Sequence, residues 1–152
     1  MKTIKPSILK EDTWHIKDNW SEDSLTMAAA TALRRLEAQG LALSWAHDMN
    51  AGERSPAESA KAKAMGLTAG EPDLRIYLMG GRIVHIELKT LKGRTSEAQT
   101  VRHARLMALG HEVYLVQVGT PMEAYLQVMA IAMAHVVDTP KHVSILLKEA
   151  SK

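Results

Sequence analysis

The chain has 152 residues, of which 46% are hydrophobic and 24% charged, and its formal net charge is +2. This predicts one folded domain over residues 21–152, preceded by an arm over residues 1–20 that either packs through its tryptophans or serves a partner. The absence of cysteine excludes a disulfide scaffold and a thiolate zinc site. No apolar run resembles a signal core or is long enough to span a bilayer, so we expect a soluble, intracellular protein.

The first elements are a helix over 22–39 and a strand over 41–46. Ser21 is a plausible N-cap, leucine and alanine follow at helical spacing, and Gly40 ends the pattern. A short apolar run then reads as a strand that leads into a polar loop.

The polar loop over 47–54 contains His47 and Asn50, which are residue types found in ββα-metal nucleases. That site needs a further histidine on a following helix, and none has the required spacing, so we set this alternative aside. A capping box with proline at the first helical position, over 55–58, predicts a short helix that ends near Gly66. Its lysines either contact DNA or are only solvated.

A hairpin is predicted over 73–89. Its two arms, 73–78 and 82–89, are rich in Val, Ile, Leu and Tyr, and Gly80-Gly81 lies between them. We expect Gly81 to take the positive φ that a bulged loop needs.

The length of the connecting loop sets which residues face each other. A two-residue turn places Leu74 opposite the charged Glu87, which mixes the two faces of the hairpin. A three-residue loop over 79–81 instead places Leu74 opposite Ile86 and Asp73 opposite Glu87. Only an odd loop length separates apolar from charged side chains, so we predict the three-residue loop.

In that register two carboxylates and an amine converge. Asp73 and Glu87 lie within a cross-strand spacing of about 5 Å between Cβ atoms, and Lys89 shares the face of Glu87. Such close carboxylates repel unless a cation lies between them, and oxygen ligands favour Mg²⁺ or Mn²⁺. Lys89 would then orient a metal-bound water or offset charge on a phosphate. The alternative is a surface strand with a Glu-x-Lys ion pair, a tripeptide expected roughly once by chance in such a chain.

Positive charge is concentrated near this hairpin. Between residues 82 and 105 the local charge is +4, which leaves −2 elsewhere. The basic residues of this segment are Arg82, Lys89, Lys92, Arg94, Arg102 and Arg105. Such a patch would hold a phosphate backbone, although a solvated helix face would have the same composition.

The rest of the chain predicts two helices and a strand. A second capping box over 96–99 opens a helix that ends at Gly110, and a strand follows over 112–118, which completes a right-handed parallel βαβ unit. A helix over 121–136 is apolar nearly all round, so either the core or another subunit covers it. Residues 141–150 form a short helix or an edge strand.

Pro72-Asp73 followed by Glu87-Leu88-Lys89 resembles the PD-(D/E)XK nuclease superfamily, and the surrounding residues are similar to its virus-type replication-repair nuclease (VRR-NUC) domain. The similarity covers most of the chain. Its further residues are Gly66, Gly70, Glu71, Leu74, Thr90, Gly93, Ser96, Gln99 and 109–113.

The resemblance implies a restriction-endonuclease-like α-β-β-β-α-β core, with a mixed central sheet flanked by helices and an extra C-terminal helix. It implies a Mg²⁺- or Mn²⁺-dependent endonuclease, in which Asp73, Glu87 and the Leu88 carbonyl bind the metal. Glu22 and Gln99 would support the site. From the residues alone, Glu22 is equally an acid favoured by the helix dipole. Gln99 either only caps its helix or reaches towards the metal-site water or the substrate phosphate, and we favour the second role.

The resemblance also implies DNA as the partner, and the basic residues expected to contact it are Arg54, Lys92, Arg94, Arg102 and Arg105. Branched or Holliday-junction-like DNA, cut by a homodimer during replication, repair or recombination in a bacterial or phage-infected cell, would fit such a domain. Two other functions remain open: a module that binds nucleic acid without cutting it, and a protein that recruits partners. The first needs no carboxylate pair, and the second needs neither the site nor the basic patch.

Overall fold

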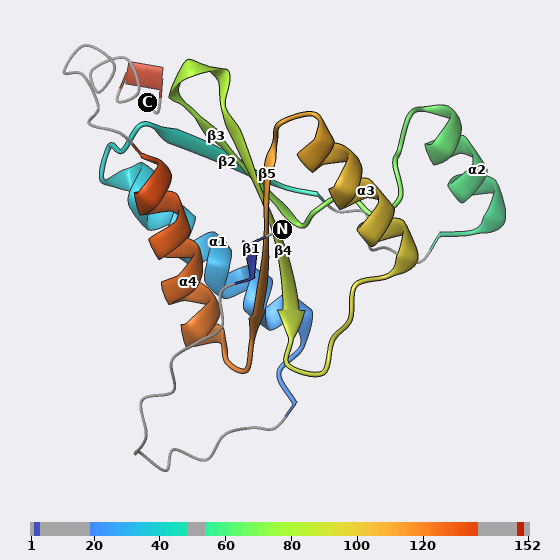
Figure 1. The fold of residues 1–152 in the computed structure, drawn as a ribbon, viewed down its shortest axis with the longest axis horizontal. Helices are drawn as coiled ribbons and strands as arrows, with labels where there is room; N and C mark the ends of the chain where they lie inside the picture. The colour runs from blue at the N-terminus through green and yellow to red at the C-terminus, as the bar shows by residue number, and fades with distance from the viewer. Residues whose placement is uncertain (1, 4–18, 49–53, 137–148, 151–152) are drawn as a thin grey trace.

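A mixed sheet with strand order β1-β5-β4-β3-β2 runs through the molecule in this computed structural model, which describes residues 2–3, 19–48, 54–136 and 149–150 (Figure 1). The strands are β1 (Lys2–Thr3), β2 (Leu43–His47), β3 (Leu74–Leu78), β4 (Ile83–Thr90) and β5 (Glu112–Val118). The pairs β2–β3 and β3–β4 are antiparallel, whereas β4–β5 and β1–β5 are parallel.

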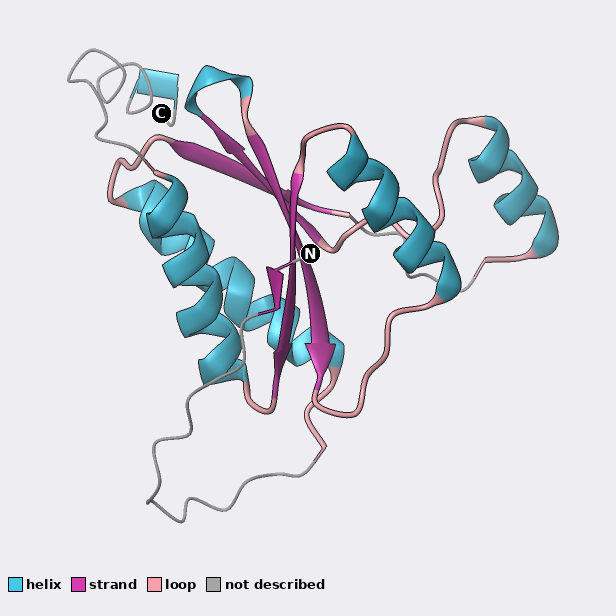
Figure 2. Ribbon diagram, viewed as in Figure 1, coloured by secondary structure: helices cyan, strands magenta, loops and turns pink. Residues whose placement is uncertain are grey.

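Helices cover both faces of the sheet (Figure 2). They are α1 (Glu22–Ala38), α2 (Pro56–Ala64), α3 (Glu97–Ala108) and α4 (Pro121–His135). The pair α1 and α4 lies on one face and α3 on the other, while α2, which has no buried residue, projects beyond α3. This is the predicted restriction-endonuclease-like α/β fold, with α4 as the extra C-terminal helix. None of the described helices is both long and apolar enough to cross a membrane.

Strand β4 separates an apolar from a polar layer. Its residues Val84, Ile86 and Leu88 belong to the hydrophobic core beneath α1 and α4. Because successive side chains of a strand point to opposite faces, the residues between them face α3. These residues are His85, Glu87 and Lys89, and all three are buried. The sheet therefore places a polar, enclosed layer on its α3 side.

The predicted register of the hairpin is confirmed. Leu74 pairs with Ile86, and the unpaired residues Met79–Gly81 form a single 3₁₀ turn. Gly80 and Gly81 have φ of 75° and 72°, so both take the left-handed conformation that was expected of Gly81 alone. The three-residue loop places apolar residues of β3 opposite apolar residues of β4, as the alternation of apolar and charged residues in β4 predicted.

Element boundaries differ from the sequence prediction by one or two residues, except at the chain ends. The predicted arm contributes strand β1 at Lys2–Thr3, which pairs with Tyr114 and Leu115 of β5. A two-residue strand has no periodicity from which it could be predicted. Trp14 and residues 141–148 lie outside the described residues.

Gly70, on the connection between α2 and β3, presses against the first turn of α3. Its φ is +80°, and a Cβ atom there would lie 2.4 Å from the Ala98 carbonyl oxygen. Gly66 offers a matched control, because its φ is +93° but a Cβ would meet nothing within 4 Å.

We expect Gly66→Ala to cost only the left-handed strain, about 1–2 kcal/mol, in the free energy of unfolding. Gly70→Ala should cost about 1–3 kcal/mol more, because the clash displaces backbone. Urea unfolding of both variants measures the difference. Equal losses would show that α3 does not depend on this contact.

Candidate active site

The site is built around two neighbouring positions of β4 that face α3. Glu87 is completely buried and Lys89 is 6% exposed. The Lys89 Nζ atom lies 2.9 Å from Glu87 Oε1 and 3.2 Å from Glu22 Oε2. A lysine amine is thus held between two carboxylates at the end of the sheet where α1 begins.

Asp73 reaches the same place from the residue before β3. Its Oδ2 accepts a hydrogen bond of 2.7 Å from the Leu88 backbone N–H, which fixes the carboxylate beside Glu87. Burial, followed by the nearby charge of Glu87, raises the pKa of Asp73 from 3.8 to about 6. The structure therefore brings together Asp73, Glu87 and Lys89, the three residues that the hairpin register predicted to converge.

Gln99 both caps α3 and contacts the site. Its Oε1 accepts from the Ser96 backbone N–H at 2.9 Å, which completes a capping box. Its Nε2 donates to Glu87 Oε1 at 2.6 Å. One amide group thus both caps α3 and contacts Glu87.

Glu22 lies in the first turn of α1, and its half-exposed side chain contacts Lys89. Gly93, in the loop after β4, leaves room for this contact. A Cβ atom at Gly93 would lie 3.0 Å from Glu22 Oε1 and 3.3 Å from Lys89 Cδ. Gln117 Nε2 holds the loop in place by donating to the Gly93 carbonyl at 2.8 Å.

The charge state of Lys89 follows from these neighbours. Burial, the largest single influence, lowers the pKa of Lys89, but the hydrogen bonds and charges of Glu87 and Glu22 together outweigh it and raise the pKa above 10.5. Lys89 is therefore a cation at neutral pH, so it supplies charge and proton donors and is not a base.

The carboxylates have the character of a divalent-cation site. Glu87 Oε2 is buried without a hydrogen-bond partner, and the charge of Glu87 disfavours ionisation of Asp73. A divalent cation would relieve the repulsion between Asp73 and Glu87, and carboxylate oxygens are ligands that Mg²⁺ and Mn²⁺ prefer. Among the described residues no group of three or more His, Asp and Glu side chains could hold a metal. The candidate ligands that the structure brings together are the carboxylates of Asp73 and Glu87.

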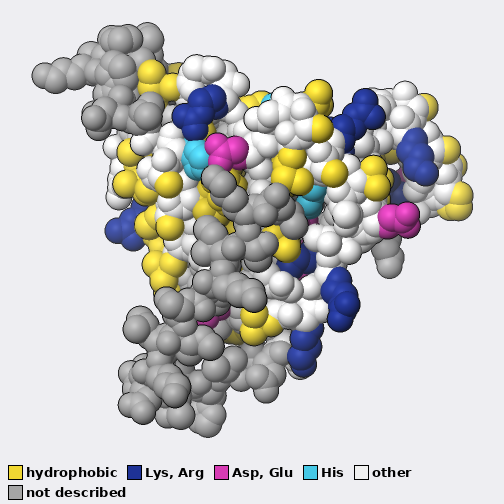
Figure 3. All heavy atoms as spheres, viewed as in Figure 1, with side chains coloured by type: hydrophobic (Ala, Val, Ile, Leu, Met, Phe, Trp, Pro, Cys, Tyr) yellow, Lys and Arg dark blue, Asp and Glu magenta, His cyan; other side chains and the backbone are white. Residues whose placement is uncertain are grey.

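The predicted DNA-contacting residues fall into two groups. Lys92, Arg94, Arg105 and Arg54 are exposed. Arg102 is different, because its Nε lies 2.6 Å from Glu71 Oε2 and fastens α3 to the segment before β3. Figure 3 shows Lys and Arg side chains over α2, α3 and the loop that precedes α3.

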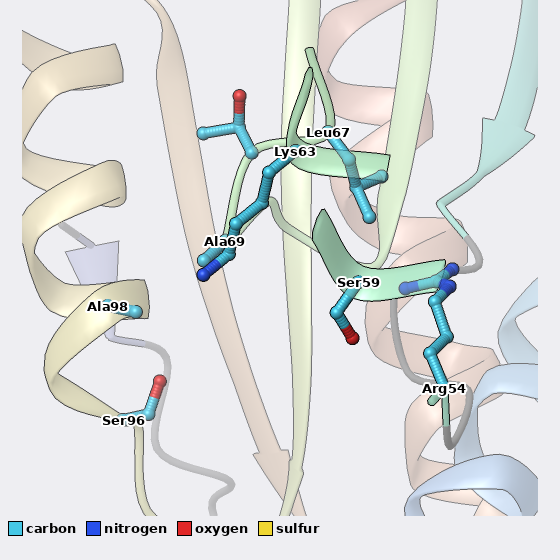
Figure 4. Close-up of a pocket in the computed structure, with 9 residues that line it drawn as sticks. Arg54, Ser59, Lys63, Leu67, Ala69, Ser96 and Ala98 are labelled. Carbon is cyan, nitrogen blue, oxygen red and sulfur yellow. The ribbon is translucent and has the colours of Figure 1, made fainter. Parts of the chain in front are cut away.

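A pocket of about 330 Å³ lies between α2 and the start of α3 (Figure 4). Arg54 and Lys63 contribute positive charge to it, and Ser59 and Ser96 contribute hydroxyl groups. No Asp or Glu is among the described residues that line it. The pocket is adjacent to Gln99, which follows Ser96 by three residues on α3 and contacts Glu87. The first turn of α3 thus contributes Ser96 and Ala98 to the pocket and Gln99 to the carboxylate cluster.

Sequence reasoning missed two buried histidines in the polar layer. His103 of α3 is 2% exposed, and its Nε2 lies 3.6 Å from Glu87 Oε2. His85 of β4 is 4% exposed, packs edge-on against His111, and has its pKa lowered to about 4 by burial. The spacing of His103, four residues after Gln99 on the same helix face, was the available signal.

Comparison with known proteins supports the fold. No protein-family model matches the sequence, and no curated protein matches it. A solved structure described as a VRR_NUC domain protein aligns with a TM-score of 0.53 at 22% identity, over 77% of this chain and 88% of that chain. Another, described as a VRR_NUC domain, aligns with a TM-score of 0.45 at 22% identity, over 72% and 95% of the two chains. The chain therefore has the α/β fold of a structure described as a VRR_NUC domain protein, and its Pro72-Asp73 and Glu87-Leu88-Lys89 motifs resemble that domain.

Proposed function

We propose that the protein is a Mg²⁺- or Mn²⁺-dependent endonuclease that hydrolyses DNA phosphodiester bonds. The observation that carries this proposal is the convergence of Asp73, Glu87 and Lys89, in which a buried carboxylate is bonded to a buried cation and a second carboxylate has a pKa of about 6. Perturbed, enclosed groups of this kind are typical of catalytic sites.

Each residue has a role in that reaction. Asp73, Glu87 and the Leu88 carbonyl would hold the metal, which would lower the pKa of a bound water and offset charge on the phosphate. Lys89, as a cation, orients the attacking water or stabilises charge on the phosphorus oxygens. Gln99 fixes one oxygen of Glu87, and Glu22 holds the Lys89 amine.

The basic residues supply the path for DNA. Lys92, Arg94 and Arg105 are exposed around α3, and the pocket lined by Arg54 and Lys63 has the size and charge to receive a backbone phosphate. These groups recognise phosphate and not base sequence. We extend the proposal to branched, Holliday-junction-like DNA as substrate, and to a role in replication, repair or recombination of phage type.

A binding module that does not cut is the alternative function. Such a module gains nothing from a buried carboxylate beside a second carboxylate with a raised pKa, because that arrangement lowers stability without contacting DNA. The cluster therefore favours the enzyme.

Cleavage assays test the proposal. Wild-type protein is incubated with covalently closed circular DNA, linear duplexes and four-way junctions, in Mg²⁺, in Mn²⁺ or without divalent metal. We expect incision only with metal, faster on junctions than on linear duplexes, and opening of the closed circles because they have no ends. Binding without incision in every metal would support the binding module instead.

We also propose that two copies associate through α4. Its exposed side chains include Met122, Leu126, Ala130 and Met133, which follow helical spacing along one face. Leu126 is 55% exposed and Met122 is 64% exposed, and Figure 3 shows apolar atoms along this helix. A two-fold axis would pair identical stripes and present two metal sites, as cutting two strands of a junction requires.

Sedimentation at micromolar concentration should give about twice the chain mass of 16.7 kDa. Leu126→Glu should give the monomer, because it places a charge in the centre of the stripe. Val101→Glu, at an equally exposed apolar position on α3, should leave the dimer intact. A wild-type monomer at all concentrations would remove the dimer.

A further inference from the structure

We infer that His103 is a positioning residue for Glu87, donating a hydrogen bond from Nε2–H to Glu87 Oε2. The inference rests on the proposed nuclease function, since it concerns the carboxylate that would bind the metal. It assigns a task to a histidine that the Asp73, Glu87 and Lys89 cluster does not otherwise use.

The first argument is burial without partners. His103 is 2% exposed and Glu87 is fully buried. Glu87 Oε2 and both ring nitrogens of His103 lack hydrogen-bond partners among the described residues. A buried polar atom left unpaired costs about 1–3 kcal/mol. One hydrogen bond between Nε2 and Oε2 would satisfy two of these atoms, and they lie 3.6 Å apart, only slightly beyond bonding distance.

The second argument is the arrangement around the carboxylate. Glu87 Oε1 already receives Lys89 Nζ at 2.9 Å and Gln99 Nε2 at 2.6 Å. His103 faces the remaining oxygen. Gln99 and His103 are four residues apart, so they project from the same face of α3. One rigid helix thus faces both oxygens of Glu87, and rotation of the carboxylate would break contacts on both sides.

Hydrogen bonds to a ligating carboxylate orient it, and their loss typically reduces metal affinity or activity about 10–100-fold. His103→Phe keeps an aromatic ring, somewhat larger than imidazole, and removes the donor. We expect it to bind Mn²⁺ about 10–100-fold more weakly than wild type and to lose kcat by a similar factor with little change in KM for DNA. His103→Gln retains a donor and should recover most of the affinity.

Two measurements separate positioning from mere packing. Urea unfolding should show His103→Phe at least as stable as wild type, because an apolar ring replaces a polar one in a buried place. His85→Phe is the control: it removes a second buried histidine from the same face of the sheet, one whose ring packs edge-on against His111. It should bind Mn²⁺ as wild type does.

Nitrogen-15 NMR of the metal-free protein tests the contact without any activity. We expect Nε2 of His103 to carry a proton. A proton on Nδ1 alone, or wild-type Mn²⁺ affinity in His103→Phe, would overturn the inference. Wild-type protein that neither binds metal nor cuts DNA would instead refute the proposed function, and the tautomer would still decide whether His103 holds Glu87.

Discussion

Lys89→Ala should keep DNA binding and metal binding but lose turnover by about 10²–10³-fold, the usual effect of removing one group that stabilises charge in a transition state. Lys89 is cationic because Glu87 and Glu22 raise its pKa, and its amine lies within 3.2 Å of the carboxylates of Glu87 and Glu22. Asp73 and Glu87, the two carboxylates that would bind the metal, remain in the variant.

Single-turnover cleavage across a Mn²⁺ titration measures this loss, and DNA affinity is measured with Ca²⁺ in place of Mn²⁺. Lys92→Ala is the control, because Lys92 is an exposed neighbour on the following loop. It should raise KM for DNA and leave kcat unchanged. Cleavage by Lys89→Ala at the wild-type rate at any metal concentration would contradict the assignment of Lys89.

The same substitution also bears on stability. Alanine leaves the buried Glu87 without its cation, and breaking a buried ion pair in this way typically costs about 3–5 kcal/mol. Circular dichroism and urea unfolding must therefore accompany the kinetics. If Lys89→Ala is folded and binds DNA but does not cleave it, the loss of cleavage reflects the chemical role of Lys89 and not its contribution to stability.

The hairpin and its three converging residues could be predicted because local rules agree there. Alternation in β4 fixes which face Glu87 and Lys89 share, and only a three-residue loop brings Asp73 to that face. The capping boxes at Ser55 and Ser96 begin α2 and α3, as expected. These are interactions between residues that are close in sequence or paired by one register.

The remainder of the site depends on how elements pack. Whether His103 faces Glu87, and whether Arg102 binds Glu71 or DNA, is decided by the rotation of α3 on the sheet, which no local pattern encodes. The contact of Glu22 with Lys89 joins residues 67 positions apart. Glu22 was expected near the site only because the sequence resembles the VRR-NUC family, and no spacing argument pointed to it.

The raised pKa of Asp73 makes a second prediction, concerning stability. A carboxyl group whose pKa is 3.8 when unfolded and about 6 when folded is destabilising once it is ionised. The cost is absent below about pH 4, grows between pH 4 and 6, and is complete above pH 6. A shift of this size corresponds to about 3 kcal/mol.

Asp73→Asn should therefore abolish cleavage and yet stabilise the metal-free protein. Asparagine keeps an oxygen that can accept from the Leu88 N–H and removes the repulsion with Glu87. In urea unfolding at pH 7.5 we expect the variant to exceed wild type by about 1–3 kcal/mol, and the difference should shrink towards zero as pH falls to 4. Asp48→Asn is the control, because it weakens a 2.7 Å ion pair with Arg75 and should destabilise.

Divalent metal should reverse the order of the two proteins. Metal that binds only the folded state stabilises it by RT ln(1 + [L]/Kd), so Mn²⁺ at a hundred times Kd would add about 2.7 kcal/mol to wild type. Asp73→Asn has lost a ligand and should gain little. Two results would contradict the view that ionised Asp73 is destabilising until a cation binds. One is an Asp73→Asn variant less stable than wild type without metal, and the other is a stability difference between the two proteins that does not change between pH 4 and 7.5. If the reversal occurs, the instability of the empty site and its affinity for metal have the same origin, the enforced proximity of Asp73 and Glu87.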